Sequence, residues 1–214
     1  MIVNSIILGR AKGSAGNVTV STQKGRTILK QKASIVSNPR SPAQLLQRAM
    51  ISRAVYVWQL YGNMLKSGIT SLVEYGSQYN TFVGINSNHF KALTFTKETF
   101  RNADLVNANA TVGRLGNLNA VPGTISADSI SFDIDTAKFQ SIAKAGDVVK
   151  VLLGHPQEQT MDFVSKTLSA NDIANFNGLQ LFQLDTNYTG TDPVCAVWLE
   201  SANGNDSTTS KFSQ

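Results

Sequence analysis

The sequence predicts an α+β protein: a β-hairpin arm at the N-terminus, a two-helix segment, and a C-terminal β-sandwich of the immunoglobulin or fibronectin kind. Helical periodicity and strong helix-start signals lie before about residue 100, whereas short runs at strand period alternate with turns after about residue 104. The chain has 214 residues and 42% hydrophobic content, which is ample for a packed core. We therefore expect two domains, residues 1–103 and 104–214.

The hairpin is predicted by "GNVTVSTQKGRTILKQKA". β-branched residues alternate from Val18 to Thr22, Lys24-Gly25 forms the turn, and a second strand runs from Arg26 to Lys32. Because successive side chains of a strand point to opposite faces, Arg26, Ile28, Lys30 and Lys32 share one face. Three of these four residues are cationic.

A long helix follows the connector "SNPRSPAQ". Ser41 supplies a capping hydroxyl and Pro42 suits the first helical position, so the helix is predicted from Pro42 to about Lys66, before Gly68. The residues spaced for its buried stripe are Leu46, Met50, Ala54, Val57, Trp58, Tyr61 and Leu65. A second helical region, interrupted by glycines, covers residues 71–93 and would pair with the first helix as an antiparallel hairpin.

Seven short runs from residue 104 onward have strand character. They are "DLVNANATV", "GTISADSISFDID", "DVVKVLLG", "TMDFVSKT", "LQLFQLD", "PVCAVWLES" and "STTSKFS". Their number, short length and turn-rich spacing predict the sandwich. "SANDIANF" is predicted as a short helix or a loop over one end of it.

The residues most often used in catalysis are sparse. Cys195 lies in an apolar run, where a buried and unreactive thiol is expected. His89 and His155 have no second ligand at metal-binding spacing, and the glycines of "GRAKGSAG" match no phosphate-binding fingerprint. We expect no enzyme activity, no cofactor and no bound metal.

Two aspartates form a candidate carboxylate pair. Asp133 and Asp135 in "SFDIDT" project from the same side of a predicted strand, the minimum for a carboxylate pair or part of a calcium site. The alternative is a solvated strand face leading into a loop. A sugar-binding module or hydrolase using these carboxylates is one hypothesis for function.

Charge is segregated along the chain. Residues 1–73 contain ten Lys or Arg and no Asp or Glu, residues 74–114 have a net charge of +1, and residues 115–214 have a net charge of −6. Such segregation indicates either a nucleic-acid surface or contacts between copies, basic part against acidic part. No run is apolar enough to span a membrane, and we expect none to do so.

The candidate partner or DNA contacts are therefore basic residues of the first third. They are Lys24, Arg26, Lys30, Lys32, Arg40, Arg48 and Arg53. Three interpretations stay open: an acidic protein surface, including that of a neighbouring copy; the phosphates of a nucleic acid; or a merely solvated face. No aromatic residue interleaves with these charges for base stacking.

The order of segments resembles an uncharacterised family of about 200 residues from Bacteroidetes bacteria and their phages. The resemblance is carried by "GNVTV" and "KGRTILK", by "SNPRSPAQLLQRAM", by "LVEYGSQYNTFVGINSN" and by the β-rich remainder. Its specific part is the Asn38-Pro39-Arg40-x-Pro42-Ala43-Gln44 connector with Arg48. Many relatives have a tryptophan-lysine-glycine turn where this chain has "TQKGR".

The resemblance implies a phage setting and no assigned catalytic residue. In that setting we expect a non-enzymatic virion protein, made in the bacterial cytoplasm, that forms a homo-oligomeric ring in the portal or tail region. Its partners would be copies of itself, neighbouring virion proteins and possible DNA phosphates. The alternative is a DNA-binding architectural protein that does not read sequence.

Overall fold

The structure, a computed structural model, describes residues 2–3, 12–23, 26–33, 35, 38–70, 76–118, 121–126, 129–176, 179–183 and 192–214. The chain divides into two compact units, Met1–Gln44 and Leu45–Gln214. The structure combines a few helices with antiparallel sheets, which agrees with the predicted α+β class. The division between the units lies well before the domain boundary predicted after residue 103.

The N-terminal unit contains a four-stranded antiparallel sheet in the order β1-β4-β3-β2. Its strands are β1 (Ile2–Val3), β2 (Gly13–Ala15), β3 (Val18–Gln23) and β4 (Arg26–Gln31). β3 and β4 are the two strands of the predicted hairpin, whereas β1 and β2 were not predicted because they are too short for a periodic pattern. Gly16, with φ of 54°, provides the left-handed residue in the turn between β2 and β3.

Helix α1 (Pro42–Leu65) has the predicted bounds within one residue and continues into a 3₁₀ turn, η1 (Lys66–Gly68). The Ser41 hydroxyl accepts from the Gln44 N–H at 3.4 Å, as a helix-capping side chain does. The buried stripe runs through Met50, Ala54, Val57, Tyr61 and Leu65. Leu46 also belongs to the predicted stripe, but it is 46% exposed.

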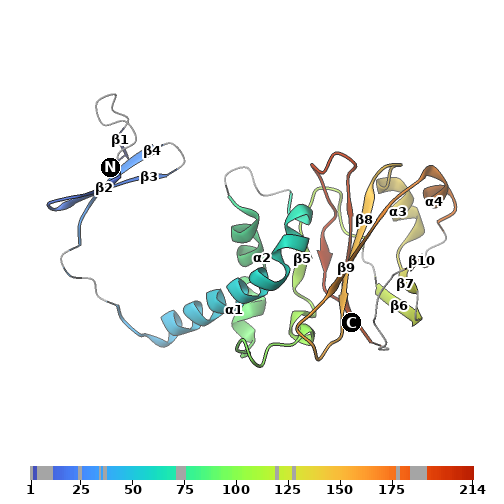
Figure 1. Ribbon diagram of the computed structural model, residues 1–214, viewed down its shortest axis with the longest axis horizontal. Helices are drawn as coiled ribbons and strands as arrows, with labels where there is room; N and C mark the ends of the chain where they lie inside the picture. Colours follow the sequence, from blue (N-terminus) through green and yellow to red (C-terminus); the bar gives the residue numbers. More distant parts are fainter. Residues whose placement is uncertain are drawn as a thin grey trace. The chain divides into compact units, whose positions relative to one another are not determined.

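Helix α2 (Gln78–Ala92) begins after Gly76 and passes through Gly84 without interruption. The Ser77 hydroxyl caps its start by accepting from the Asn80 N–H at 3.2 Å. Figure 1 shows α1 running across α2, so the two helices cross instead of lying side by side. The Trp58 ring makes the contact, 5.4 Å from the Phe82 ring centroid.

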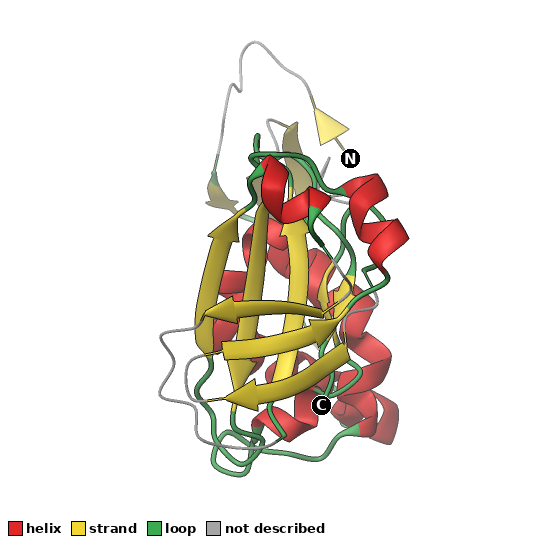
Figure 2. Ribbon diagram, turned by 90° about the vertical axis from the view of Figure 1, so that its right-hand side faces the viewer, coloured by secondary structure: helices red, strands yellow, loops and turns green. Residues whose placement is uncertain are grey.

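Two three-stranded antiparallel sheets follow, in the orders β11-β8-β9 and β10-β7-β6. The first is built from β8 (Val148–Gly154), β9 (Asp162–Thr167) and β11 (Val194–Glu200). The second is built from β6 (Val121–Ser126), β7 (Ser129–Asp133) and β10 (Leu179–Gln183). In Figure 2 the strands of the second sheet run across those of the first.

Shorter elements complete the larger unit. Strand β5 (Asn109–Thr111) pairs with β12 (Ser210–Lys211), and the helices are α3 (Thr136–Ile142), α4 (Ala170–Ala174) and the 3₁₀ turn η2 (Asn102–Leu105). The first run predicted as a strand therefore starts as a 3₁₀ turn. Its start is fixed by the Asp104 carboxylate, which accepts from the Arg101 N–H at 2.9 Å.

The sheet β11-β8-β9 lies between two hydrophobic clusters. Leu152, Ala196 and Trp198 face the cluster that contains the buried residues of α1 and α2. Val151 and Val197 face the other cluster, with Phe139 of α3. Figure 1 shows α1 and α2 on one side of β8 and β9, and α3 and α4 on the other. The helical segment shares a core with the C-terminal strands, and for this reason the units do not divide after residue 103.

Candidate interaction surface

The structural boundary at residue 44 also separates the charges. The N-terminal unit contains seven Lys or Arg residues and no Asp or Glu, a net charge of +7. The larger unit contains the other twelve Lys or Arg and all fourteen Asp and Glu, a net charge of −2. The excess positive charge of the protein therefore belongs to the small unit.

The register of β3 with β4 sorts the side chains of the small sheet onto two faces. Residues directly opposite each other in an antiparallel pair share a face, and here Thr19 lies opposite Lys30 and Val20 opposite Leu29. We call one side the cationic face; its members are Ser14, Thr19, Ser21, Gln23, Arg26, Ile28 and Lys30. We call the other side the apolar face; its members are Gly13, Ala15, Val18, Val20, Thr22, Thr27, Leu29 and Gln31.

The described side chains of the apolar face range from buried to exposed. No apolar side chain described in the N-terminal unit is buried, and Thr27 is the one described residue there that is. Val18 is 39% exposed, while Val20 and Leu29 are partly exposed. A small sheet without a core of its own is marginally stable in water. Contact of the apolar face with another surface would remove apolar area of Val18, Val20 and Leu29 from water.

Four of the five predicted cations of this unit lie among the described residues. Arg26, Lys30, Lys32 and Arg40 are exposed, and Lys24 lies outside the described residues. The Lys32 N–H donates to the Asn17 carbonyl at 2.7 Å, which extends the ladder one residue beyond β4. Strand alternation then puts Lys32 on the same side as Lys30.

The two predicted cations of α1 differ in environment. Arg48 is exposed in the second turn of the helix. Arg53 is partly buried, and its guanidinium donates to the Phe90 carbonyl at 3.1 Å and to the Phe95 carbonyl at 3.2 Å. These carbonyls belong to the last turn of α2 and the segment after it, so Arg53 holds the end of α2. Arg53 is therefore not part of the interaction surface.

A second uncovered apolar region lies at the start of α1. Leu45, Leu46 and Ile51 are 49%, 46% and 45% exposed. The first buried residue of the helix is Met50, so the apolar pattern of the sequence starts one turn before the core does. Helical periodicity predicted Leu46 as part of the buried stripe, and this is wrong because the residue precedes the core.

The two carboxylates of the sugar-binding hypothesis, Asp133 and Asp135, have different environments. The Asp135 side chain accepts from the Lys138 N–H at 3.1 Å and caps α3. Asp133 is exposed at the end of β7. One carboxylate is thus occupied by the start of α3, a helix that was not predicted.

The two histidines form hydrogen bonds with backbone groups, and the cysteine is buried. His89 Nε2 donates to the Asp104 carbonyl at 2.8 Å, and His155 Nδ1 accepts from the Gln157 N–H at 3.2 Å. Cys195 is buried, as predicted, and burial raises the pKa of its thiol to about 11. Among the described residues, no three His, Cys, Asp or Glu side chains gather as a metal site would require.

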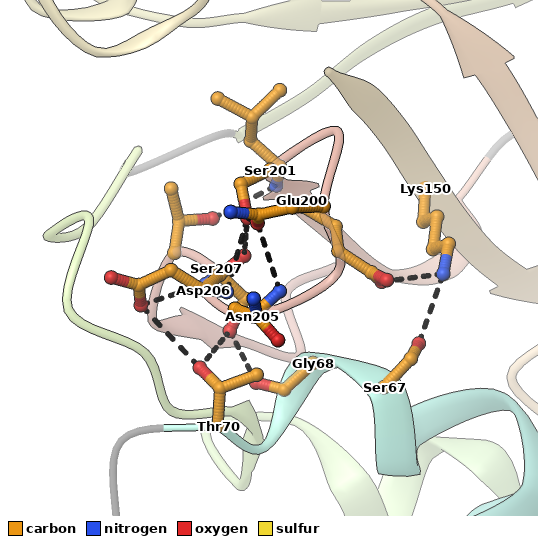
Figure 3. A network of polar contacts seen from close by, with 12 residues as sticks. Ser67, Gly68, Thr70, Lys150, Glu200, Ser201, Asn205, Asp206 and Ser207 are labelled. Carbon is orange, nitrogen blue, oxygen red and sulfur yellow. Dashed lines mark hydrogen bonds and ion pairs between the residues drawn. The ribbon is translucent and has the colours of Figure 1, made fainter. Parts of the chain in front are cut away.

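One polar cluster joins the end of α1 to the sheet (Figure 3). Lys150 Nζ lies 3.0 Å from Ser67 Oγ and 2.5 Å from Glu200 Oε2. A Ser-Lys pair can be catalytic when the amine accepts the serine proton. Here Lys150 Nζ donates to both the Glu200 carboxylate and the Ser67 hydroxyl. An amine that donates in this way has no free lone pair to accept the serine proton.

In the rest of this cluster, side chains bind backbone groups of other segments. The Ser207 hydroxyl donates to the Gly68 carbonyl at 2.7 Å, and Asp206 accepts from the Arg114 N–H at 2.8 Å (Figure 3 labels Ser207, Gly68 and Asp206). These contacts hold η1, the segment after β5 and the turn after β11 together. Their role is structural.

Comparison of the sequence with protein-family models, with curated proteins and with solved structures finds no match. The family resemblance carried by the connector therefore stays a prediction. Among the described residues, no helix is long and apolar enough to cross a membrane.

Proposed function

We propose that the protein is a non-enzymatic structural subunit that assembles with copies of itself. In this proposal the apolar face of the N-terminal sheet docks on a neighbouring copy. The setting we propose is a phage virion, with the subunits forming a ring in the portal or tail region beside other virion proteins.

The observation that carries the proposal is a folded unit without buried apolar side chains among its described residues. Two to four short strands need a packed face to be stable. A neighbouring subunit supplies such a face, and the exposed apolar start of α1 offers matching surface with Leu45, Leu46 and Ile51. Burying apolar surface on both partners would contribute about 25 cal/mol for each Å² removed from water.

The charge distribution supports contact between unlike surfaces. A unit of net charge +7 and a unit of net charge −2 on the same chain attract each other between copies, which orients a head-to-tail contact. Such contacts generate closed rings when the rotation between subunits closes.

Two finer features of the fold belong to this proposal. Residues 12–33 would act as the predicted arm, and the two antiparallel sheets after residue 120 support a sandwich in its general form. The strands of the two sheets cross, and helices cover the side of β11-β8-β9 away from the second sheet (Figures 1 and 2). These features differ from an aligned immunoglobulin sandwich.

Light scattering behind a sizing column tests the proposal. We expect the wild-type chain to have a molar mass that is a discrete multiple of 23.1 kDa and that is held as the protein is diluted. Electron microscopy of the same fraction should show closed particles. A mass of 23.1 kDa at every concentration would refute self-assembly.

A further inference from the structure

We propose that the cationic face of the N-terminal sheet binds the phosphate backbone of duplex DNA without reading its sequence. This inference concerns the face opposite to the one that docks on a neighbouring copy. It follows from the strand register, which places Arg26 and Lys30 on one side of the sheet and Val20 and Leu29 on the other.

The cations of this face have no opposing charge within their unit. Residues 1–44 contain no Asp or Glu. The ion pairs Lys150–Glu200 and Lys166–Asp172 lie in the larger unit. Arg26, Lys30 and Lys32 are exposed. Their attraction for an external polyanion is therefore not offset by a carboxylate of their own unit.

The other side chains of the face suit a phosphate partner. Thr19 and Ser21 lie opposite Lys30 and Ile28 and carry hydroxyls, and Gln23 lies opposite Arg26. Lys, Arg, Ser, Thr and Gln side chains supply most protein contacts to DNA phosphates. The face thus combines charge with neutral donors and has no acceptor-only group.

The row of cations is longer than a duplex groove is wide. A strand rises about 3.3 Å per residue, so Arg26 and Lys32 lie about 20 Å apart along the strand, with Lys30 between them. The major groove of B-DNA is about 12 Å wide and admits a two-stranded ribbon. A row of this length can contact phosphates on both sides of the groove.

The composition favours a duplex over a single strand. Residues 1–44 contain no Phe, Tyr or Trp. Proteins that hold single strands stack bases on aromatic side chains, and the sheet has none to offer. Contacts to the backbone alone give affinity without base recognition, so unrelated duplexes should bind equally.

The test measures anisotropy of labelled duplexes of two unrelated sequences, with the full chain, from about 0.05 to 0.2 M salt. One variant is Lys30→Gln/Lys32→Gln. The matched control is Lys144→Gln/Lys211→Gln, which removes the same charge from exposed positions of the larger unit. The molar mass of every sample is measured in parallel by light scattering.

Counterion release gives the expected values. Each phosphate contact contributes about 0.9 to the slope of log affinity against log salt, so three cations give a slope of about −2.7. The Lys30→Gln/Lys32→Gln variant should have a slope shallower by about 1.8, and its affinity at 0.1 M salt should be about 60-fold lower. The control should keep the wild-type slope, and both sequences should bind alike.

Three results would overturn the inference: equal DNA affinity for the variant and the control, tighter binding of a single strand than of the duplex, or loss of assembly in the variant with DNA affinity unchanged. The last result would assign the cations to an acidic protein surface. A monomeric wild type with the expected salt slopes would refute the ring and leave this inference standing.

Discussion

The Tyr61 hydroxyl lies between two acceptors in the interior of the larger unit, 2.6 Å from Asn102 Oδ1 and 2.7 Å from the Gln159 carbonyl oxygen, and its one proton is shared between them. Asn102 in turn donates to the carbonyls of His155 and Thr160. These bonds hold the loop between β8 and β9 against α1. Burial raises the pKa of Tyr61 well above its usual range, so the phenol stays a hydrogen-bond donor.

Tyr61→Phe should therefore lower the free energy of unfolding by about 1–3 kcal/mol, because it leaves buried acceptors without their donor. Urea denaturation followed by tryptophan fluorescence measures this, since both tryptophans, Trp58 and Trp198, lie in the larger unit. Tyr79→Phe, at a partly exposed position of α2, is the control and should change the value by less than about 0.5 kcal/mol. Equal losses in the two variants would argue against the Tyr61 network.

Two glycine substitutions should have opposite effects. A Cβ on Gly113 would lie 1.8 Å from the Ser207 carbonyl oxygen, which is backbone and cannot move aside alone. Gly113→Ala should cost about 3 kcal/mol, at the upper end of overpacking costs. A Cβ on Gly84 meets nothing within 4 Å, so Gly84→Ala in α2 should stabilise by about 0.5–1 kcal/mol. Thermal denaturation compares the two, and a stabilising Gly113→Ala would contradict the close approach.

The Cys195 thiol should be unreactive in the folded protein. Burial raises its pKa to about 11, so almost no thiolate exists at pH 8. Dithionitrobenzoate should label this thiol only as fast as the protein unfolds, and at once in denaturant. Raising the pH from about 8.5 toward 11 should also lower stability, because only the unfolded thiol ionises there. Rapid labelling of native protein would contradict this.

The start of α4 should show the opposite pH dependence. The Asp172 carboxylate accepts from the Ser169 hydroxyl at 2.7 Å and from Lys166 Nζ at 2.9 Å, and these contacts hold the pKa of Asp172 well below its usual range. Asp172→Asn should cost about 1 kcal/mol at pH 7, as loss of a helix cap does.

The stabilising contribution of Asp172 is present above the usual aspartate pKa of about 4 and lost as the pH falls below it. The difference in unfolding free energy between wild type and Asp172→Asn should therefore be equal at pH 7 and pH 5 and smaller at pH 3. A difference that grows toward pH 3 would contradict the assignment.

Much of the fold follows from local patterns. The Ser41-Pro42 start and the stripe through Met50 and Leu65 give α1 nearly to the residue, because cap chemistry and helical period are local. Helix α3 was missed since it is short and depends on a distant contact, the stacking of Phe139 on Phe176 at 4.1 Å. Periodicity also shows that β8 and β11 are apolar, but not that each face packs against a different cluster.

The candidate surface could be predicted in part. The period of β4 puts Arg26 and Lys30 on one face from sequence alone. Which residues of β3 join them depends on register, and this decides that Val20 lies on the opposite face with Leu29. Arg53 looked equivalent to the other cations, since nothing local reveals that the Phe90 and Phe95 carbonyls accept from it.

The most direct test of the central claim compares two neighbouring residues of β3. Thr19 lies on the cationic face and Val20 on the apolar face, so Thr19→Asp and Val20→Asp add the same charge to opposite sides of one strand. Light scattering should show that Val20→Asp is a 23.1 kDa monomer whereas Thr19→Asp keeps the wild-type multimer. Tryptophan fluorescence should show an intact larger unit in both. A Val20→Asp protein that assembles as the wild type does would contradict docking through the apolar face.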